Sequence, residues 1–314
     1  MPTDDPFAAP TRRAFLQALA LPLLAPLAVP LAACTPRDPA LDAGDTAAPA
    51  APAATPAAAG PASTAAMRLG VQLYTLRDAL GKDLEGTLAQ LQQIGYRNVE
   101  PFTHHGKTPQ EFRAILDRHQ LAAPSAHVPI ADLRASAERV LDAAATLGHQ
   151  WVVIPWLDDK ERTADGYKRV AGEMSRWGQL ARARQIGLAY HNHDFEFAPI
   201  AGSTQTGWDI LRAEADRELV KYELDVYWAT KAGKDALAIM TAEPGRVTQI
   251  HAKDATAAPE RKMVDVGAGT IDWATIVRQG RGVGLQNVFV EHDNPTDAIA
   301  SARAGFTHLQ SIVS

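Results

Sequence analysis

Short apolar runs alternate with longer amphipathic stretches from Met67 to Ser314. The run Trp151-Val-Val-Ile154 is apolar throughout, which is typical of a strand buried on both faces, whereas Ala131 to Leu147 has helical periodicity. Because the two patterns alternate, we predict a parallel α/β fold. The expected strands span residues 69–74, 98–100, 122–127, 151–154, 187–191, 220–225, 247–251 and 287–291.

Capping residues bound the expected helices. Gly95 follows one helical pattern as a C-cap, and Thr108 with Pro109 is typical of a helix start. The helices are expected at residues 83–94, from 108 onward, and at 131–147, 164–185, 207–215, 235–241, 272–278 and 296–312. Residues 67–314 have about the length of a (β/α)8 TIM barrel, typically ~250 residues. The competing Rossmann sheet lacks its G-x-G-x-x-G motif after the first strand.

The first 66 residues differ from the rest of the chain. Arg12 and Arg13 precede an apolar stretch that three prolines interrupt, which indicates a Tat-type export signal rather than a membrane-spanning helix. Leu31-Ala-Ala-Cys34 resembles a lipobox, so we expect residues 1–34 to be a lipoprotein signal and Cys34 a lipid anchor. Residues 35–66 are rich in alanine and proline and are expected to form a disordered tether. The sequence therefore predicts an exported, membrane-anchored domain on the periplasmic face.

Composition narrows the class of protein. The net charge of −5 gives no general attraction to nucleic acid or to anionic lipid, so nucleic acid is not an expected partner. A single cysteine excludes an internal disulfide. The barrel is therefore expected to depend on packing alone, with contact to a membrane only through the anchor.

Four of the expected strands end in residues that bind metals. They are His191, Asp225, His251 and Glu291. The carboxyl ends of the strands in such a barrel meet at one mouth, so these side chains are expected to converge there. Two imidazoles and two carboxylates suit a divalent cation of borderline hardness. Asp225 also fits the alternative of a helix N-cap.

Further candidates follow the same strands. His193 shares the phase of His191, and Lys253 shares that of His251, although a surface ion pair between Lys253 and Asp254 is an alternative. With Glu196 and Glu291, these residues form the candidate catalytic set. Substrate contact is expected from Glu100, His127, Trp156 and Trp228. The turn from Gly267 to Trp273 suits either a phosphate cradle or an ordinary loop capped by Asp272.

Several segments together resemble the sugar phosphate isomerase/epimerase family of xylose-isomerase-like TIM barrels. They are Tyr190-His-Asn-His-Asp-Phe-Glu-Phe197, Glu223-Leu-Asp-Val-Tyr-Trp228, His251-Ala-Lys-Asp254, Val266-Gly-Ala-Gly-Thr-Ile-Asp-Trp273 and Val290-Glu-His-Asp293. The resemblance implies one divalent metal, Mn, Co, Zn or Mg, held at positions matching Asp225, His251 and Glu291. Many members carry a carboxylate where this chain has His191, so either His191 or Glu196 is expected to fill that position.

The resemblance implies an enzyme that acts on a ketose, keto-sugar or inosose. Its metal stabilises the enediolate formed when a base removes the proton beside a carbonyl. Return of the proton gives isomerisation or epimerisation. A lyase or hydratase acting on 3-keto-sugars is an alternative, and a non-catalytic sugar-binding lipoprotein is a second one. A DNA repair endonuclease and a glycoside hydrolase fit the charge and the mixed ligand set less well.

Overall fold

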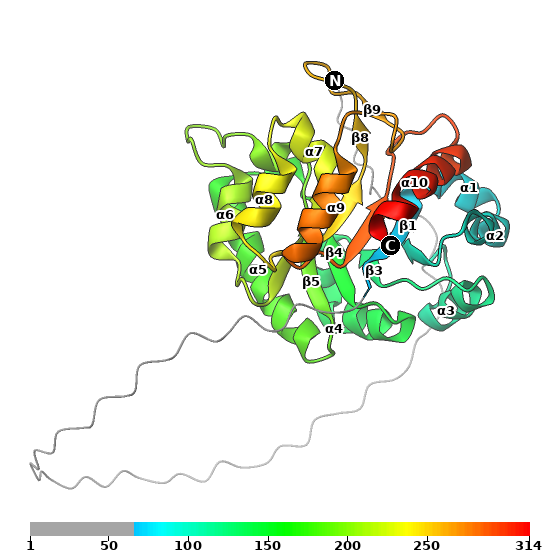
Figure 1. Cartoon of the computed structure of the whole chain (residues 1–314). Helices are drawn as coiled ribbons and strands as arrows, with labels where there is room; N and C mark the ends of the chain where they lie inside the picture. Colours follow the sequence, from blue (N-terminus) through cyan, green and yellow to red (C-terminus); the bar gives the residue numbers. More distant parts are fainter. Residues whose placement is uncertain (1–65) are drawn as a thin grey trace, which may run out of the picture. The chain divides into compact units, whose positions relative to one another are not determined.

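Eight parallel strands form one sheet at the centre of the fold, as the alternating pattern predicts (Figure 1). The computed structural model describes residues 66–314, so the expected signal, Cys34 and nearly all of the expected tether lie outside the described residues and stay predictions. The strands are β1 (Arg68–Gln72), β2 (Asn98–Glu100), β3 (Ser125–His127), β4 (Trp151–Ile154), β5 (Gly187–His191), β6 (Val220–Asp225), β7 (Val247–Ala252) and β10 (Asn287–Val290).

The strand order makes this sheet a nearly closed barrel. It runs β2-β1-β10-β7-β6-β5-β4-β3, so the last strand in the chain pairs with the first. Where the edge strands β2 and β3 meet, the Val99 amide donates to the Ala122 carbonyl at 2.8 Å. The His127 amide donates to the Pro101 carbonyl at 2.9 Å. The predicted TIM barrel architecture is therefore confirmed.

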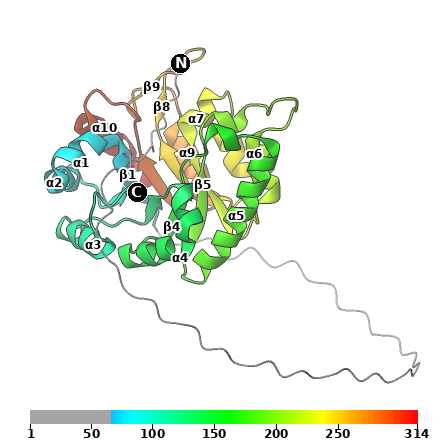
Figure 2. The same ribbon diagram turned by 180° about the vertical axis from the view of Figure 1, so that it is seen from behind.

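Helices surround the strands, and Figure 2 shows α4 and α5 on the side opposite α9. The pattern of helix after strand follows from the outward apolar face of each strand, which a helix must cover. The helices are α1 (Arg77–Lys82), α2 (Leu84–Ile94), α3 (Pro109–Arg118), α4 (Ile130–Leu147), α5 (Ala164–Arg182), α6 (Gly207–Glu214), α7 (Val226–Lys231), α8 (Ala236–Ala242), α9 (Trp273–Gly282) and α10 (Ala298–Val313).

The barrel interior is packed, which leaves its mouth as the place for chemistry. Phe289 is fully buried beside Gly70, and a Cβ added at Gly70 would lie 2.6 Å from the Phe289 ring. Only glycine leaves room for this ring inside the barrel. Burial of such a side chain stabilises the fold by roughly 1.5–3 kcal/mol. The titratable side chains described below lie toward the carboxyl ends of the strands, whereas Asn287 at the start of β10 donates to Gln249 at 2.9 Å.

Several helix boundaries agree with the sequence-based expectations. Asp83 caps α2 and Gly95 ends it, and α3 begins with a capping box between Thr108 and Glu111. Gly148 ends α4 in a left-handed conformation, as expected of a glycine C-cap. The residues that signal helix ends therefore act locally, as the sequence predicts.

Other boundaries were predicted wrongly. The first strand was expected to reach Tyr74, but it ends at Gln72. Its side chain accepts from the Tyr74 amide and starts a 3-10 turn over Leu73–Leu76. The third strand was expected from Ala122, which instead makes one isolated bridge to Asn98. At the first strand, apolar residues continue because the turn after it is buried as well. At the third strand, Pro124, which lacks a backbone N–H, separates Ala122 from the regular strand.

A small hairpin extends the chain beyond β7. It pairs β8 (Asp254–Ala255) with β9 (Met263–Val264) in antiparallel register and stands at one end of the barrel (Figure 1). Two-residue strands carry no alternation that a sequence pattern can reveal. Among residues 66–314, no helix has the length and the apolar composition needed to cross a membrane.

Candidate metal centre

Ligand atoms from three strand ends converge at the barrel mouth. Asp225 ends β6, His251 lies in β7 and Glu291 follows β10, and one ligand atom from each lies within 4.8 Å of the others. The register accounts for this convergence, because Asp225 pairs with His251 and the Glu291 amide donates to Ala252 at 3.0 Å. The structure thus brings together three of the four residues expected to bind a metal.

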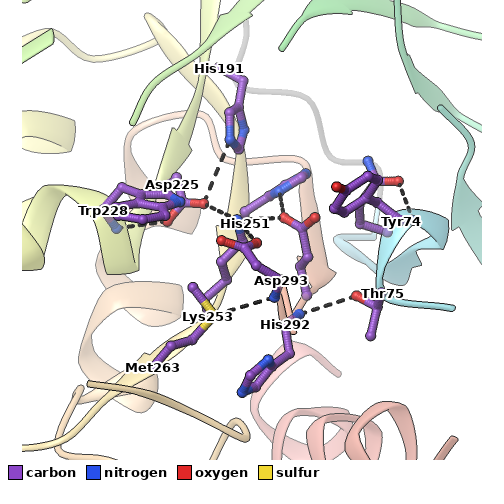
Figure 3. A network of polar contacts seen from close by, with 12 residues as sticks. Tyr74, Thr75, His191, Asp225, Trp228, His251, Lys253, Met263, His292 and Asp293 are labelled. Carbon is purple, nitrogen blue, oxygen red and sulfur yellow. Dashed lines mark hydrogen bonds and ion pairs between the residues drawn. The ribbon is translucent and has the colours of Figure 1, made fainter. Parts of the chain in front are cut away.

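The fourth residue, His191, lies beside this group. Its Nε2 atom is 3.7 Å from Asp225 Oδ2, and its Nδ1 atom is 3.1 Å from Glu223 Oε2. In Figure 3, the side chains of His191, Asp225 and Lys253 point toward the space around His251. His191 therefore lies between Asp225 and a second group of possible ligands that includes Glu223.

The two oxygens of Asp225 have different environments. Oδ1 accepts from the Trp228 amide at 2.9 Å and caps α7, so the alternative of a helix N-cap is also realised. Oδ2 is buried and accepts no hydrogen bond within the described residues, although Lys253 Nζ forms an ion pair with it at 3.0 Å. Burial raises the pKa of Asp225 to about 6. One oxygen thus holds the backbone while the other faces the centre of the site.

A second group of ligand atoms lies next to the first. It consists of His127, His191, Glu223 and His251, all buried and within 4.8 Å of one another. Glu223 was not among the predicted metal-binding residues, although it is in phase with Asp225 on β6. That phase was the available signal, because residues two apart in a strand point to the same side. Glu100, expected to contact substrate, also lies here, with Oε2 2.6 Å from His251 Nε2.

Carboxylates outnumber cations around His251. Five of them converge, from Glu100, Glu223, Asp225, Glu291 and Asp293, against the ammonium of Lys253 and the imidazoles. Burial opposes a charge on His251, but the carboxylates of Glu223, Glu291 and Glu100 outweigh it and raise its pKa well above the usual range. Uncompensated buried carboxylates are costly, so a set of this composition suits a bound cation.

Lys253 neutralises part of this charge and is not a surface residue. Its Nζ atom lies 3.0 Å from Asp225, 2.9 Å from Glu291 and 2.6 Å from Asp293. Desolvation disfavours the ammonium, but these carboxylates outweigh it and raise the pKa of Lys253 well above its usual value. The alternative ion pair with Asp254 is absent among the described contacts, since Asp254 serves another loop.

Aromatic side chains line one side of the mouth. The His193 ring lies 4.7 Å from that of Trp156 and 5.4 Å from that of Trp228, and it stacks on Phe195 at 5.7 Å. The guanidinium of Arg162 lies 3.5 Å above the Phe195 ring. Burial lowers the pKa of His193 well below its usual value, so the ring is neutral. These residues form an apolar wall beside the ligand atoms.

Glu196 is buried but directed away from the two groups of ligand atoms. One oxygen accepts from the Tyr190 hydroxyl and the other from the His193 amide at 2.7 Å. Tyr190 belongs to the outward face of β5, because β5 places His191 inward. Burial raises the pKa of Glu196 to about 7. The residue thus braces the turn that carries His193.

The Gly267 turn holds a carboxylate of the protein itself. Asp254 accepts from the Gly267 amide at 2.9 Å and from the Ile271 amide at 3.2 Å, and the Trp273 indole also donates to it. Asp272 caps α9 through the Thr275 amide at 3.0 Å. Because Asp254 occupies the amides of this turn, the ordinary capped loop describes it better than a phosphate cradle.

Known proteins resemble this chain in sequence. The chain is 24% identical over 200 residues to an inosose dehydratase of Lacticaseibacillus casei, a match that covers 56% of this chain and 65% of that protein. The chain thus spans slightly less than two thirds of the relative's length.

Solved structures share the fold. A sugar phosphate isomerase/epimerase from Parabacteroides distasonis superposes with a TM-score of 0.69 at 21% identity, over 82% of this chain and 98% of that one. The IOLI protein with a bound zinc atom superposes with a TM-score of 0.61 at 16% identity, over 79% of this chain and 98% of that one. Residues 88–312 match the xylose isomerase-like TIM barrel family, well over half of the sequence. The chain therefore belongs to the xylose isomerase-like TIM barrel family.

Proposed function

We propose that this protein is a metal-dependent enzyme that moves a proton next to the carbonyl of a ketose, keto-sugar or inosose. The observation that carries this proposal is the convergence of Asp225, His251 and Glu291 within 4.8 Å at the barrel mouth. Oxygen and imidazole ligands of this kind suit Mn²⁺, Co²⁺, Zn²⁺ or Mg²⁺. Asp225 Oδ2 supports the fit, because it is buried and, among residues 66–314, is paired only with the Lys253 ammonium at 3.0 Å and accepts no hydrogen bond.

Each residue of the mouth then has a distinct role. A bound divalent ion supplies the positive charge that polarises the substrate carbonyl. Lys253 and His251 outweigh the effect of burial and hold the pKa of Glu291 well below its usual range, so Glu291 is ionised and serves as the proton acceptor. Lys253 remains within 2.9 Å of Glu291 to balance its charge.

The wall beside the site favours an uncharged sugar. Trp156 and Trp228 offer apolar faces against which the C–H face of a sugar ring packs. The nearby cations are already engaged, Lys253 by three carboxylates, Arg162 by the Leu157 carbonyl at 2.9 Å and Arg77 by the Asp293 carbonyl at 2.8 Å. A phosphate would compete with these partners, so we propose an unphosphorylated substrate.

Elimination of water is the second candidate reaction. Loss of a hydroxyl after proton abstraction would make the enzyme a dehydratase or lyase. The similarity to the L. casei inosose dehydratases supports loss of water as the outcome. The two reactions share their first step, so the same residues serve both.

Solvent deuterium exchange tests the proposal. The metal-loaded full chain is incubated in D₂O with free ketoses, 3-keto-sugars and inososes, and the substrates are followed by NMR. We expect exchange at one carbon beside the carbonyl, dependent on the ion. A change of stereochemistry or carbonyl position indicates an isomerase or epimerase, and loss of water indicates a dehydratase. Sugar binding without exchange would contradict the proposal and favour the non-catalytic alternative.

We propose that Glu196 positions His193 rather than acting as a base, and its burial predicts a pH effect on stability. Between its unfolded pKa of about 4.5 and its folded pKa of about 7, the folded chain keeps a proton that the unfolded chain has lost. The free energy of unfolding therefore falls as pH rises, by up to about 1.4 kcal/mol per pH unit from this group. Glu196→Gln is expected to remove that slope in urea denaturation between pH 5 and pH 7.

The exposed Glu138 of α4 provides the matched control. Glu138→Gln makes the same chemical change and is expected to leave the slope unchanged. If the curves for Glu196→Gln and the unmodified chain run parallel over this range, Glu196 is not the protonated buried group described.

A further inference from the structure

Three histidine nitrogens surround one carboxylate oxygen in the second group of ligand atoms. Glu223 Oε2 lies 2.7 Å from His127 Nε2, 3.1 Å from His191 Nδ1 and 3.0 Å from His251 Nε2. The four residues come from four strands, β3, β5, β6 and β7, and all are buried. Because Glu223 precedes Asp225 by two positions on β6, it lies about 6–7 Å farther into the barrel along the strand.

We propose that this group is a second divalent-cation site, formed by His127, His191, Glu223 and Nε2 of His251. The inference goes beyond the proposed function and shares with it only His251, whose Nδ1 atom faces Glu291 at 2.6 Å. His251 thus presents one nitrogen to each group, and binding of both ions at once would require it to release both ring protons and to bridge the ions as an imidazolate. The ligand set of the deeper site is three imidazoles and one carboxylate, which is a typical set for Zn²⁺ or Co²⁺.

A hydrogen-bond network explains the same atoms less well. A carboxylate has about four acceptor directions on its two oxygens. Here nitrogens of all three imidazoles lie within 3.1 Å of one oxygen, although His251 Nε2 is closer to Glu100 Oε2, at 2.6 Å. Glu223 Oε1 is buried and has no hydrogen-bond partner in the described part of the chain. Glu100 Oε1 is in the same state nearby. Burying two carboxylate oxygens without hydrogen-bond partners costs free energy of folding unless a cation binds them.

The spacing of the ligand atoms also fits an ion. Four ligands at about 2.0–2.1 Å from a tetrahedral ion lie roughly 3.3 Å from one another. The nitrogen-to-oxygen distances of 2.7–3.1 Å are a few tenths of an ångström shorter. A small outward movement of the side chains, without movement of the strands, would therefore accommodate an ion.

The excess of carboxylates makes two cations tolerable in one barrel. Glu100 and Glu223 lie near the deeper group, and Asp225, Glu291 and Asp293 lie near the upper one. A single divalent ion with Lys253 leaves this set negative. The two groups also differ in chemistry, since imidazoles dominate the deeper group and carboxylates the upper one. The deeper site is expected to prefer Zn²⁺ or Co²⁺ over Mg²⁺.

Metal stoichiometry tests the second site. The full chain, without a polyhistidine tag, is stripped with a chelator and titrated with Zn²⁺ by calorimetry. We expect two bound ions in the unmodified chain and one in Glu223→Gln. Asp225→Asn should also bind one ion, held by the other site. His127→Gln gives a second variant should Glu223→Gln fail to fold, and circular dichroism checks each fold.

The outcomes separate this inference from the proposed function. One ion in the unmodified chain that is lost in Asp225→Asn and kept in Glu223→Gln overturns the deeper site and leaves the proposed function intact. One ion that is lost in Glu223→Gln and kept in Asp225→Asn supports the deeper group as a site and overturns the upper one. No bound ion overturns both. The visible absorption spectrum of bound Co²⁺ provides an independent readout. We expect the bands of nitrogen-rich tetrahedral Co²⁺ to be lost in Glu223→Gln and kept in Asp225→Asn.

Discussion

Asp225→Asn is expected to lower ion-dependent deuterium exchange by at least about 10³-fold, equivalent to about 4 kcal/mol of transition-state stabilisation. Oδ1 of Asp225 caps α7 through the Trp228 amide, and asparagine keeps that acceptor. Oδ2 faces His191 and Lys253, and the substitution removes its charge. The fold should therefore survive while the metal ligand is lost. Exchange into whichever compound the deuterium-exchange screen shows to be a substrate, followed by NMR, gives the measurement.

A matched control isolates the metal role from the capping role. Asp272 caps α9 in the same way, through the Thr275 amide at 3.0 Å, but is exposed and belongs to neither group of ligand atoms. Asp272→Asn is expected to leave exchange unchanged. Exchange in Asp225→Asn within about tenfold of the unmodified chain would show that Asp225 holds no ion needed for the reaction.

The barrel was predictable because its strands are simple sequence signals. The observed bounds of β4, β5 and β6 equal the expected ones, since β4 and β5 are short apolar runs that end abruptly and β6 alternates apolar and charged residues up to Asp225. The turn over Leu73–Leu76 was not predictable in this way, because its residues are as buried as those of the strand before it. Hydrophobic residues indicate burial. They distinguish a strand from a buried turn only where the apolar sequence stops at the end of the strand.

The convergence of the candidate ligands at the strand ends was predictable for the same reason. Once β6, β7 and β10 are placed in a parallel barrel, Asp225, His251 and Glu291 must meet at its mouth. The role of Glu223 depends on ring closure, which brings His127 of β3 toward β6 and β7. The local sequence does not indicate that His127 and Glu223 lie close together. Glu196 shows the opposite case, because a 3-10 turn after β5 directs a residue expected at the mouth toward Tyr190.

Lys253→Met is expected to destabilise the chelator-treated protein by about 3–5 kcal/mol, since removing one partner of a buried charge group leaves the others unpaired. Three carboxylates lose their shared ammonium, those of Asp225, Glu291 and Asp293. A divalent ion in the upper site would take over part of this neutralisation. We therefore expect Zn²⁺ or Mn²⁺ to raise the melting temperature of Lys253→Met more than that of the unmodified chain.

Lys160→Met is the matched control for Lys253→Met, because it removes an exposed lysine instead of a buried one. Lys160 pairs with Asp158 at 3.1 Å, but 80% of its side chain is exposed, so water already screens the pair. Its replacement should change the melting temperature little, with or without the ion. Equal effects in the two variants would show that Lys253 is not balancing buried charge. A loss of stability in Lys253→Met that no divalent ion relieves would place the cation-binding carboxylates elsewhere, because an ion among Asp225, His251 and Glu291 must compensate for the missing ammonium.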